Sequence, residues 1–76
     1  MELEVFVAKF AAQFELTNVE DISADTDFKE LDEWDSLVSL SVIGMVKNEY
    51  KVKIAGSDIK NAKTVEDLYN LVKSRM

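Results

Sequence analysis

Ser36 is the side chain whose position along the chain most suggests chemistry. It follows Asp35 and precedes Leu37, where a mainly apolar run begins that extends to Tyr50. Aspartate and serine favour a helix N-terminus because their side-chain oxygens accept hydrogen bonds from amides that the helix leaves unpaired. The sequence therefore predicts a helix over 36–50 with Ser36 in its first turn, and makes this serine the candidate site.

The chain lacks the residues that usually assist a catalytic serine. Its 76 residues include no histidine and no cysteine. A serine nucleophile needs a base within hydrogen-bond reach, and no pattern places a lysine or carboxylate beside Ser36 in that role. Without cysteine, neither a disulfide nor a thiolate metal site can form. We therefore predict no catalytic residue and a protein that is not an enzyme.

The charge balance is acidic, with fifteen acidic and nine basic residues and a net charge of −6. Phosphate backbones would repel such a chain, so we expect no nucleic-acid partner and instead partners with basic patches. Asp21, Asp25 and Asp27 have part of the spacing of a calcium loop. Thr26, however, stands where the loop needs glycine, and Asp32 where it needs a bidentate glutamate, so we predict no specific metal site.

Helical periodicity dominates the apolar pattern. A helix is predicted over 2–15, with apolar residues at spacings of three and four on one face. Its apolar face consists of Leu3, Phe6, Val7, Phe10 and Phe14. The run 36–50 is apolar almost all the way round, whereas a helix facing one core needs an arc of roughly 100°. This second helix is therefore either central or offers part of its surface to something else.

The connection over 16–34 is long but not featureless. Segments 17–20 and 27–30 have the spacing of a capping box, which predicts one or two short helical turns. Four spaced apolar residues are expected to hold the connection on the core and to argue against disorder. They are Val19, Ile22, Phe28 and Leu31.

The last third of the chain predicts two more helices. Segment 51–54 alternates like a strand but has no partner segment, so we expect an extended connector. A short helix follows over 57–62, and Thr64 is predicted to cap the last helix. The buried face of that helix is expected to comprise Val65, Leu68, Tyr69, Val72 and Met76. The sequence predicts an all-α, small four-helix bundle in one domain, 1–76. No signal peptide or membrane span is visible, which predicts a cytoplasmic protein without membrane insertion.

The motif Asp35-Ser36-Leu37, opening an apolar helix near the middle of an acidic helical domain, resembles the acyl carrier protein family. The wider family includes peptidyl and D-alanyl carriers. The resemblance implies that Ser36 carries 4′-phosphopantetheine, transferred from coenzyme A by a phosphopantetheinyl transferase. It also implies that Asp35 helps to orient that reaction, and that Leu37 is a contact at the start of the recognition helix. A phosphodiester on Ser36 would lie beside the unpaired amides and the positive dipole end of the helix.

This resemblance also implies the partners of the chain. The thiol of the arm holds acyl or aminoacyl groups as thioesters, which a loading ligase supplies and downstream transferases remove. We expect a monomer. The main alternative is an unmodified helical interaction module that docks partners through its second helix.

Several positions depart from the common family pattern. Glu33 stands where that pattern has glycine, and Val38 and Ser41 stand where fatty-acid carriers have acids. Lys47 reduces the negative charge of the same helix further. We therefore predict a carrier of a specialised pathway rather than of core fatty-acid synthesis.

Four residues are candidate partner contacts. Trp34 is expected to be partly buried, either anchoring the connection or contacting partners as an interface aromatic. In a four-helix arrangement Val38 and Ser41 are expected to project outward near Ser36. Met45 is the fourth candidate. The alternative for Val38 and Met45 is that both are simply core residues.

Overall fold

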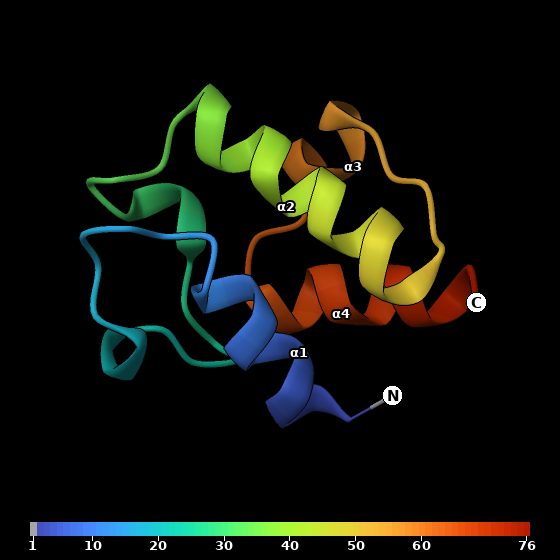
Figure 1. Ribbon diagram of the computed structural model, residues 1–76, viewed down its shortest axis with the longest axis horizontal. Helices are drawn as coiled ribbons and strands as arrows, with labels where there is room; N and C mark the ends of the chain where they lie inside the picture. The colour runs from blue at the N-terminus through green and yellow to red at the C-terminus, as the bar shows by residue number, and fades with distance from the viewer. Residues whose placement is uncertain (1) are drawn as a thin grey trace.

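The computed structural model describes residues 2–76 and is built from helices (Figure 1). The elements in order are α1 (Leu3–Ala11), η1 (Val19–Asp21), η2 (Phe28–Glu30), α2 (Ser36–Tyr50), α3 (Gly56–Asn61) and α4 (Val65–Ser74), where η denotes a short 3₁₀ helix. No strand occurs in these residues. The predicted all-α bundle, with three longer helices and one short one, is confirmed.

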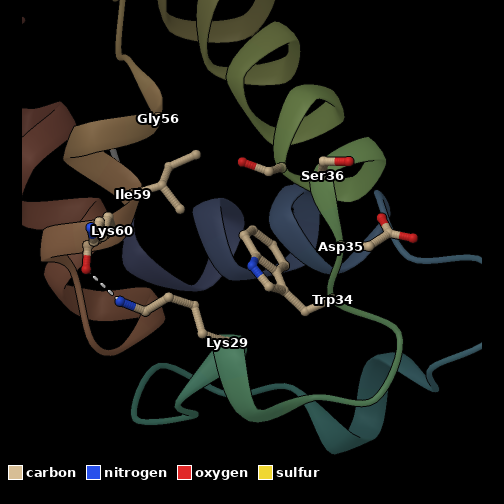
Figure 2. Close-up of a pocket in the computed structure, with 8 residues that line it drawn as sticks. Lys29, Trp34, Asp35, Ser36, Gly56, Ile59 and Lys60 are labelled. Carbon is tan, nitrogen blue, oxygen red and sulfur yellow. Dashed lines mark hydrogen bonds between the residues drawn. The ribbon is translucent and has the colours of Figure 1, made fainter.

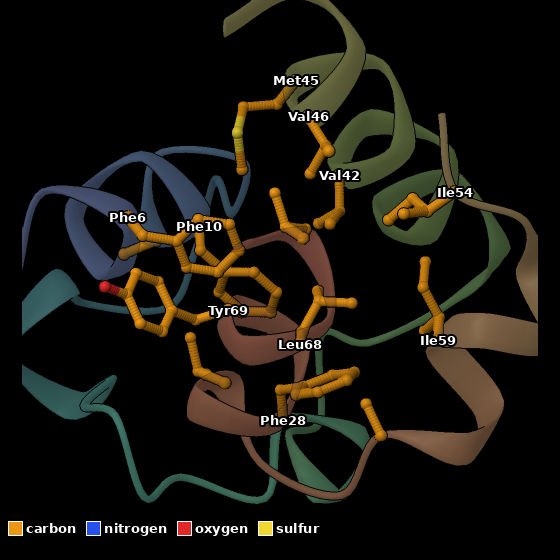
Figure 3. Packing of buried hydrophobic residues seen from close by; sticks show 14 of the residues in the cluster. Phe6, Phe10, Phe28, Val42, Met45, Val46, Ile54, Ile59, Leu68 and Tyr69 are labelled. Carbon is orange, nitrogen blue, oxygen red and sulfur yellow. The ribbon is translucent and has the colours of Figure 1, made fainter. Parts of the chain in front are cut away.

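Helices α1, α2 and α4 share one hydrophobic core (Figure 3). Phe6 and Phe10 of α1 are fully buried, as is Leu68 of α4. Phe10 lies at the centre of an aromatic group, with its ring centroid 5.3 Å from that of Phe28 and 6.3 Å from that of Trp34. Each of these aromatic side chains buries a large apolar area, which matters in so small a domain.

Helix α1 is shorter than the predicted helix over 2–15. It ends at Ala11 because the hydrogen bonds then change: the amides of Gln13 and Phe14 donate to carbonyls three residues back. Further on, the amides of Glu15 and Leu16 donate to the Glu33 carboxylate. Phe14 remains buried beyond the helix end.

The connection between α1 and α2 fills one side of the molecule, from blue to green in Figure 1. Both predicted helical turns form, as η1 and η2. Ile22 and Phe28 are buried and Leu31 packs against the core, as predicted. The prediction for Val19 was wrong: its side chain is 58% exposed, because η1 buries none of its residues and the chain reaches the core only at Ile22.

The second half follows the prediction closely. Helix α2 spans 36–50 as expected, and Lys51 ends it in a left-handed conformation with φ of 59°. An extended segment leads to α3, and Thr64 caps α4. Met76 was wrongly placed on the buried face of α4: the helix ends at Ser74, and Met76 lies beyond it, 64% exposed. None of the helices between residues 2 and 76 has the length and apolar character that a membrane crossing requires.

Candidate attachment site

Asp35 sets the start of α2. Its backbone is extended, and its Oδ1 accepts a hydrogen bond from the Val38 amide at 2.9 Å. Its carbonyl oxygen accepts from the Ser39 amide at 3.0 Å. Asp35 is therefore the N-cap, which satisfies two of the first four amides of the helix and leaves Ser36 as the first helical residue.

Ser36 and Leu37 keep their donors free. Within residues 2–76, neither amide finds an acceptor, and the Ser36 hydroxyl makes no hydrogen bond. Both residues are exposed, with Leu37 at 71%. The first turn therefore presents an accessible hydroxyl beside two unpaired amides at the positive end of a 15-residue helix, an arrangement that suits a phosphate ester.

A groove of about 410 Å³ opens beside Ser36, between the start of α2, η2 and α3 (Figure 2). Trp34 and Ile59 supply apolar walls. Lys29 reaches across from η2 and donates a hydrogen bond to the Lys60 carbonyl at 2.6 Å, which ties the connection to α3. The groove thus offers an apolar surface with two lysines at its rim, next to the candidate serine.

A second groove, of about 270 Å³, lies on the other side of Leu37. The beginning of the α1–α2 connection contributes Glu15 and Leu16, and α2 contributes Leu37 and Ser41. The two grooves share Asp35, so the first turn of α2 stands between them.

Glu33 has a structural role. Its carboxylate accepts hydrogen bonds from the amides of Glu15, Leu16 and Thr17, at 2.7, 3.0 and 2.7 Å, and from the Thr17 hydroxyl at 2.8 Å. Desolvation acts to raise the pKa of Glu33, but these four bonds outweigh it, and its pKa lies below the ordinary value. Glu33, which stands where the common pattern has glycine, thus joins the two ends of the α1–α2 connection.

Trp34 is half-buried, as predicted. Its ring lies against Phe28 at 4.8 Å and Phe14 at 6.1 Å between centroids. Part of the same ring lines the first groove, so Trp34 anchors the connection and also reaches the surface near Ser36.

Two expected partner contacts are not at the surface. Val38 and Met45 are 8% and 7% exposed, so the prediction that Val38 projects outward was wrong and Met45 packs in the core. They share the inward stripe of α2 with Val42 and Val46, at spacings of four, seven and eight from Val38. Ser41 is exposed, as expected.

The sequence reasoning missed Leu40, which is 63% exposed. Leu40 follows Leu37 by three residues, so the two lie on one face of α2. The signal was present, because a run that is apolar all round must leave some apolar residues outside the core. Lys29 and Lys60 were also missed, since nothing in the sequence links these two distant residues. Among residues 2–76, no three acidic side chains gather into a possible metal site.

The comparisons with known proteins bear on the same region. A family model described as the phosphopantetheine attachment site matches residues 4–72. No curated protein and no solved structure gives a significant match. Members of that family carry a covalently attached 4′-phosphopantetheine group, and their carrier domains are generally non-catalytic. Since the match covers nearly the whole chain, this protein belongs to the family of phosphopantetheine-binding carrier domains.

Proposed function

We propose that this chain is a carrier protein whose Ser36 bears the 4′-phosphopantetheine group. The arm would hold acyl or aminoacyl groups as thioesters and present them to successive enzymes. The observation that carries the proposal is the first turn of α2, where an exposed hydroxyl stands beside two amides without acceptors. Membership of the phosphopantetheine family supplies the group that such a turn would accept.

The residues of the chain divide the work around that group. The amides of Ser36 and Leu37 would donate to phosphate oxygens, where the helix dipole favours negative charge. Asp35 holds the turn in shape through Val38 and Ser39, and it is the acid that we expect to help orient the transfer reaction. The base that removes the Ser36 proton comes from the phosphopantetheinyl transferase. The attached arm supplies a thiol that a cysteine-free chain lacks.

We also propose a specialised pathway rather than core fatty-acid synthesis. Ser41 and Lys47 are both exposed on α2, and neither residue is an acid. The surface of α2 therefore has no carboxylate at these two positions. Val38 no longer supports this view by itself, because a buried position would exclude an acid in any pathway. Efficient service of fatty-acid elongation enzymes by the modified protein, in competition with their own carrier, would contradict the proposal.

In this setting we expect a cytoplasmic monomer. Its partners would be a phosphopantetheinyl transferase, a loading ligase for acyl or aminoacyl groups, and downstream transferases. The family membership supports partners of this general kind, because carrier domains work with transferases and synthetases.

An unmodified interaction module is the second candidate. The observation that favours it is the exposure of Leu37 and Leu40, since apolar side chains of that size in a small acidic domain suggest a surface that a partner covers.

Intact mass separates the two candidates. The chain is incubated with coenzyme A, Mg²⁺ and a broad-specificity phosphopantetheinyl transferase, then weighed. Ser39→Ala is the matched control, because Ser39 lines the same groove one turn further along α2. We expect the wild type and Ser39→Ala to gain one phosphopantetheine and Ser36→Ala to gain none. No gain on the wild type would contradict the carrier and favour the module.

A further inference from the structure

The segment that leads into α2 is held from two sides. The Trp34 ring packs on the aromatic group, with its centroid 4.8 Å from that of Phe28. Figure 2 shows the Asp35 carboxylate pointing to the opposite side of the segment, where its Oδ1 caps α2. Glu33 is half-buried and lines the second groove together with Asp35. The residues just before Ser36 are therefore fixed by aromatic packing on one side and by carboxylates on the other.

Glu33 ties this segment to the beginning of the α1–α2 connection. Its carboxylate accepts hydrogen bonds from three consecutive amides, and within residues 2–76 these amides have no backbone acceptor. The preceding residue, Phe14, is buried, so the amides belong to a segment that the core anchors. Hydrogen bonds to an ionised acceptor are stronger than those to a neutral one. We call the Glu33 carboxylate and the amides of Glu15, Leu16 and Thr17 the Glu33 bridge.

The backbone at Glu33 does not require glycine. Residues 31–34 form a turn in which the Trp34 amide donates to the Leu31 carbonyl at 3.0 Å. Glu33 is the third residue of this turn, a position that needs a positive φ only in the turn types that favour glycine there. Among residues 2–76, Lys51 is the only non-glycine residue with a positive φ, so that of Glu33 is negative. Glutamate therefore fits the turn without strain, and its side chain is available for the bridge.

We infer that Glu33 is a positioning residue for the modification of Ser36. The Glu33 bridge fixes the segment that enters α2, so that the Asp35 cap forms and the Ser36 hydroxyl is presented in one place. Glu33 precedes Ser36 by three residues, a stretch that spans at most about 11 Å even when extended, so a bridge at Glu33 leaves the hydroxyl little freedom to shift. This inference rests on the proposed function.

The transfer reaction needs a hydroxyl that is held in place. The Ser36 oxygen forms a bond to the phosphorus that carries the pantetheine of coenzyme A, as the bond from that phosphorus to the leaving oxygen breaks. Adenosine 3′,5′-bisphosphate departs, and the serine proton passes to the base of the transferase. The attacking and leaving oxygens must lie roughly in line, and a misplacement of about 1 Å can lower the rate by about a hundredfold. Glu33, whose carboxylate is bound by residues 15–17, acts only through the position of Ser36.

Steady-state kinetics of phosphopantetheine transfer to the full chain test the inference. Glu33→Ala removes the bridge, and we expect kcat to fall about tenfold while KM stays within about twofold of the wild type. The reason is that alignment of the hydroxyl is needed only as the bond forms, whereas the rest of the surface is unchanged. Glu33→Gln keeps one neutral acceptor oxygen and should lose less, and it provides the same test if Glu33→Ala does not fold.

Asp67→Ala is the matched control. It also removes one negative charge and a carboxylate that accepts from backbone amides, in this case those of Lys63 and Thr64 at the start of α4. Because α4 does not lead into Ser36, kcat and KM of this variant should both stay within about twofold of the wild type.

Amide hydrogen exchange gives a readout that does not depend on the transferase. The Val38 amide, which donates to Asp35, should exchange several-fold faster in Glu33→Ala than in Asp67→Ala. The inference would be overturned by a kcat of Glu33→Ala within about twofold of the wild type, by equal losses of kcat in Glu33→Ala and Asp67→Ala, or by equal exchange of Val38 in these two variants. In each of these cases modification of the wild type would still uphold the carrier. A wild type that is never modified would overturn the proposed function and this inference with it.

Discussion

The two helices that begin with a well-formed cap, α2 and α4, differ in what their first turns leave open. At α4, Thr64 Oγ1 accepts from the Asp67 amide at 3.1 Å, and the Asp67 carboxylate accepts in return from the Thr64 amide. The amides of Val65 and Glu66 donate to carbonyls of the α1–α2 connection at 3.2 and 2.8 Å. Every early amide of α4 therefore has a protein acceptor.

The first amides of α2 are only partly provided with acceptors. Asp35 satisfies the amides of Val38 and Ser39, but those of Ser36 and Leu37 find no acceptor in residues 2–76. The first turn of α4 also contains Glu66 and Asp67, whereas that of α2 contains no acid. The chain thus provides acceptors for all the first amides of α4 but not for those of Ser36 and Leu37 in α2. A phosphate there would provide both the acceptor oxygens and the negative charge that α4 obtains from its own residues.

The largest expected effect comes from removing the support beneath the α2 start. Phe10 is fully buried and packs against Phe28 and Trp34. Trp34 directly precedes Asp35, the N-cap of α2. Phe10→Ala should lower the free energy of unfolding by about 3–5 kcal/mol, because it leaves a cavity in the core. Urea denaturation measures this. A loss below 1 kcal/mol would show that the aromatic group is not what holds the connection.

Removing the N-cap of α4 should lower the free energy of unfolding by a smaller amount. Thr64→Ala removes the side-chain acceptor of the Asp67 amide and should lower the free energy of unfolding by about 1 kcal/mol. Thr64→Ser keeps the hydroxyl and serves as the control. Equal losses in both variants would mean that the threonine methyl group, and not the cap, stabilises α4.

Glu33 links the comparison to pH. Because its folded pKa is lowered, its carboxylate stabilises the fold above the ordinary pKa of 4.5, and this contribution is lost as pH falls through the lower folded value. Glu33→Gln should therefore melt below the wild type at pH 7. The difference should shrink as pH falls below 4.5. A difference that stayed constant to pH 3 would contradict the role of the charge.

The smallest effect should be that of Ser36→Ala on stability. The Ser36 hydroxyl makes no hydrogen bond within the described chain, so its loss should change the free energy of unfolding by less than about 1 kcal/mol. Urea denaturation beside Thr64→Ala gives the comparison. A larger loss at Ser36 than at Thr64 would mean that the serine is part of the fold and not kept free for modification.

The sequence predicted best where local rules decide. The bounds of α2 follow from Asp35 as a cap and from the apolar run to Tyr50, and the Thr64 cap follows from the same reasoning. The sequence-based prediction failed where the rotation of a helix about its axis decides which residues face the core. In a helix that is apolar all round, periodicity does not decide whether Val38 or Leu40 faces the core, and tertiary packing chose Val38.

Contacts between distant segments were beyond sequence reasoning. Glu33 looked like a mere departure from a family pattern, because nothing local indicates that it would collect three amides from residues 15–17. The bond from Lys29 to the Lys60 carbonyl and those from α4 to the connection end on backbone oxygens, which every residue has. Such acceptors leave no trace in the pattern of side chains.

Peptide-resolved mass spectrometry of the transferase product tests the central claim most directly, because it assigns the added group to one of the chain's serines. The account predicts 4′-phosphopantetheine on Ser36, with Ser39 and Ser41 unmodified. Attachment at either of those two serines, or a Ser36 peptide that stays unmodified when the reaction is complete, would contradict it.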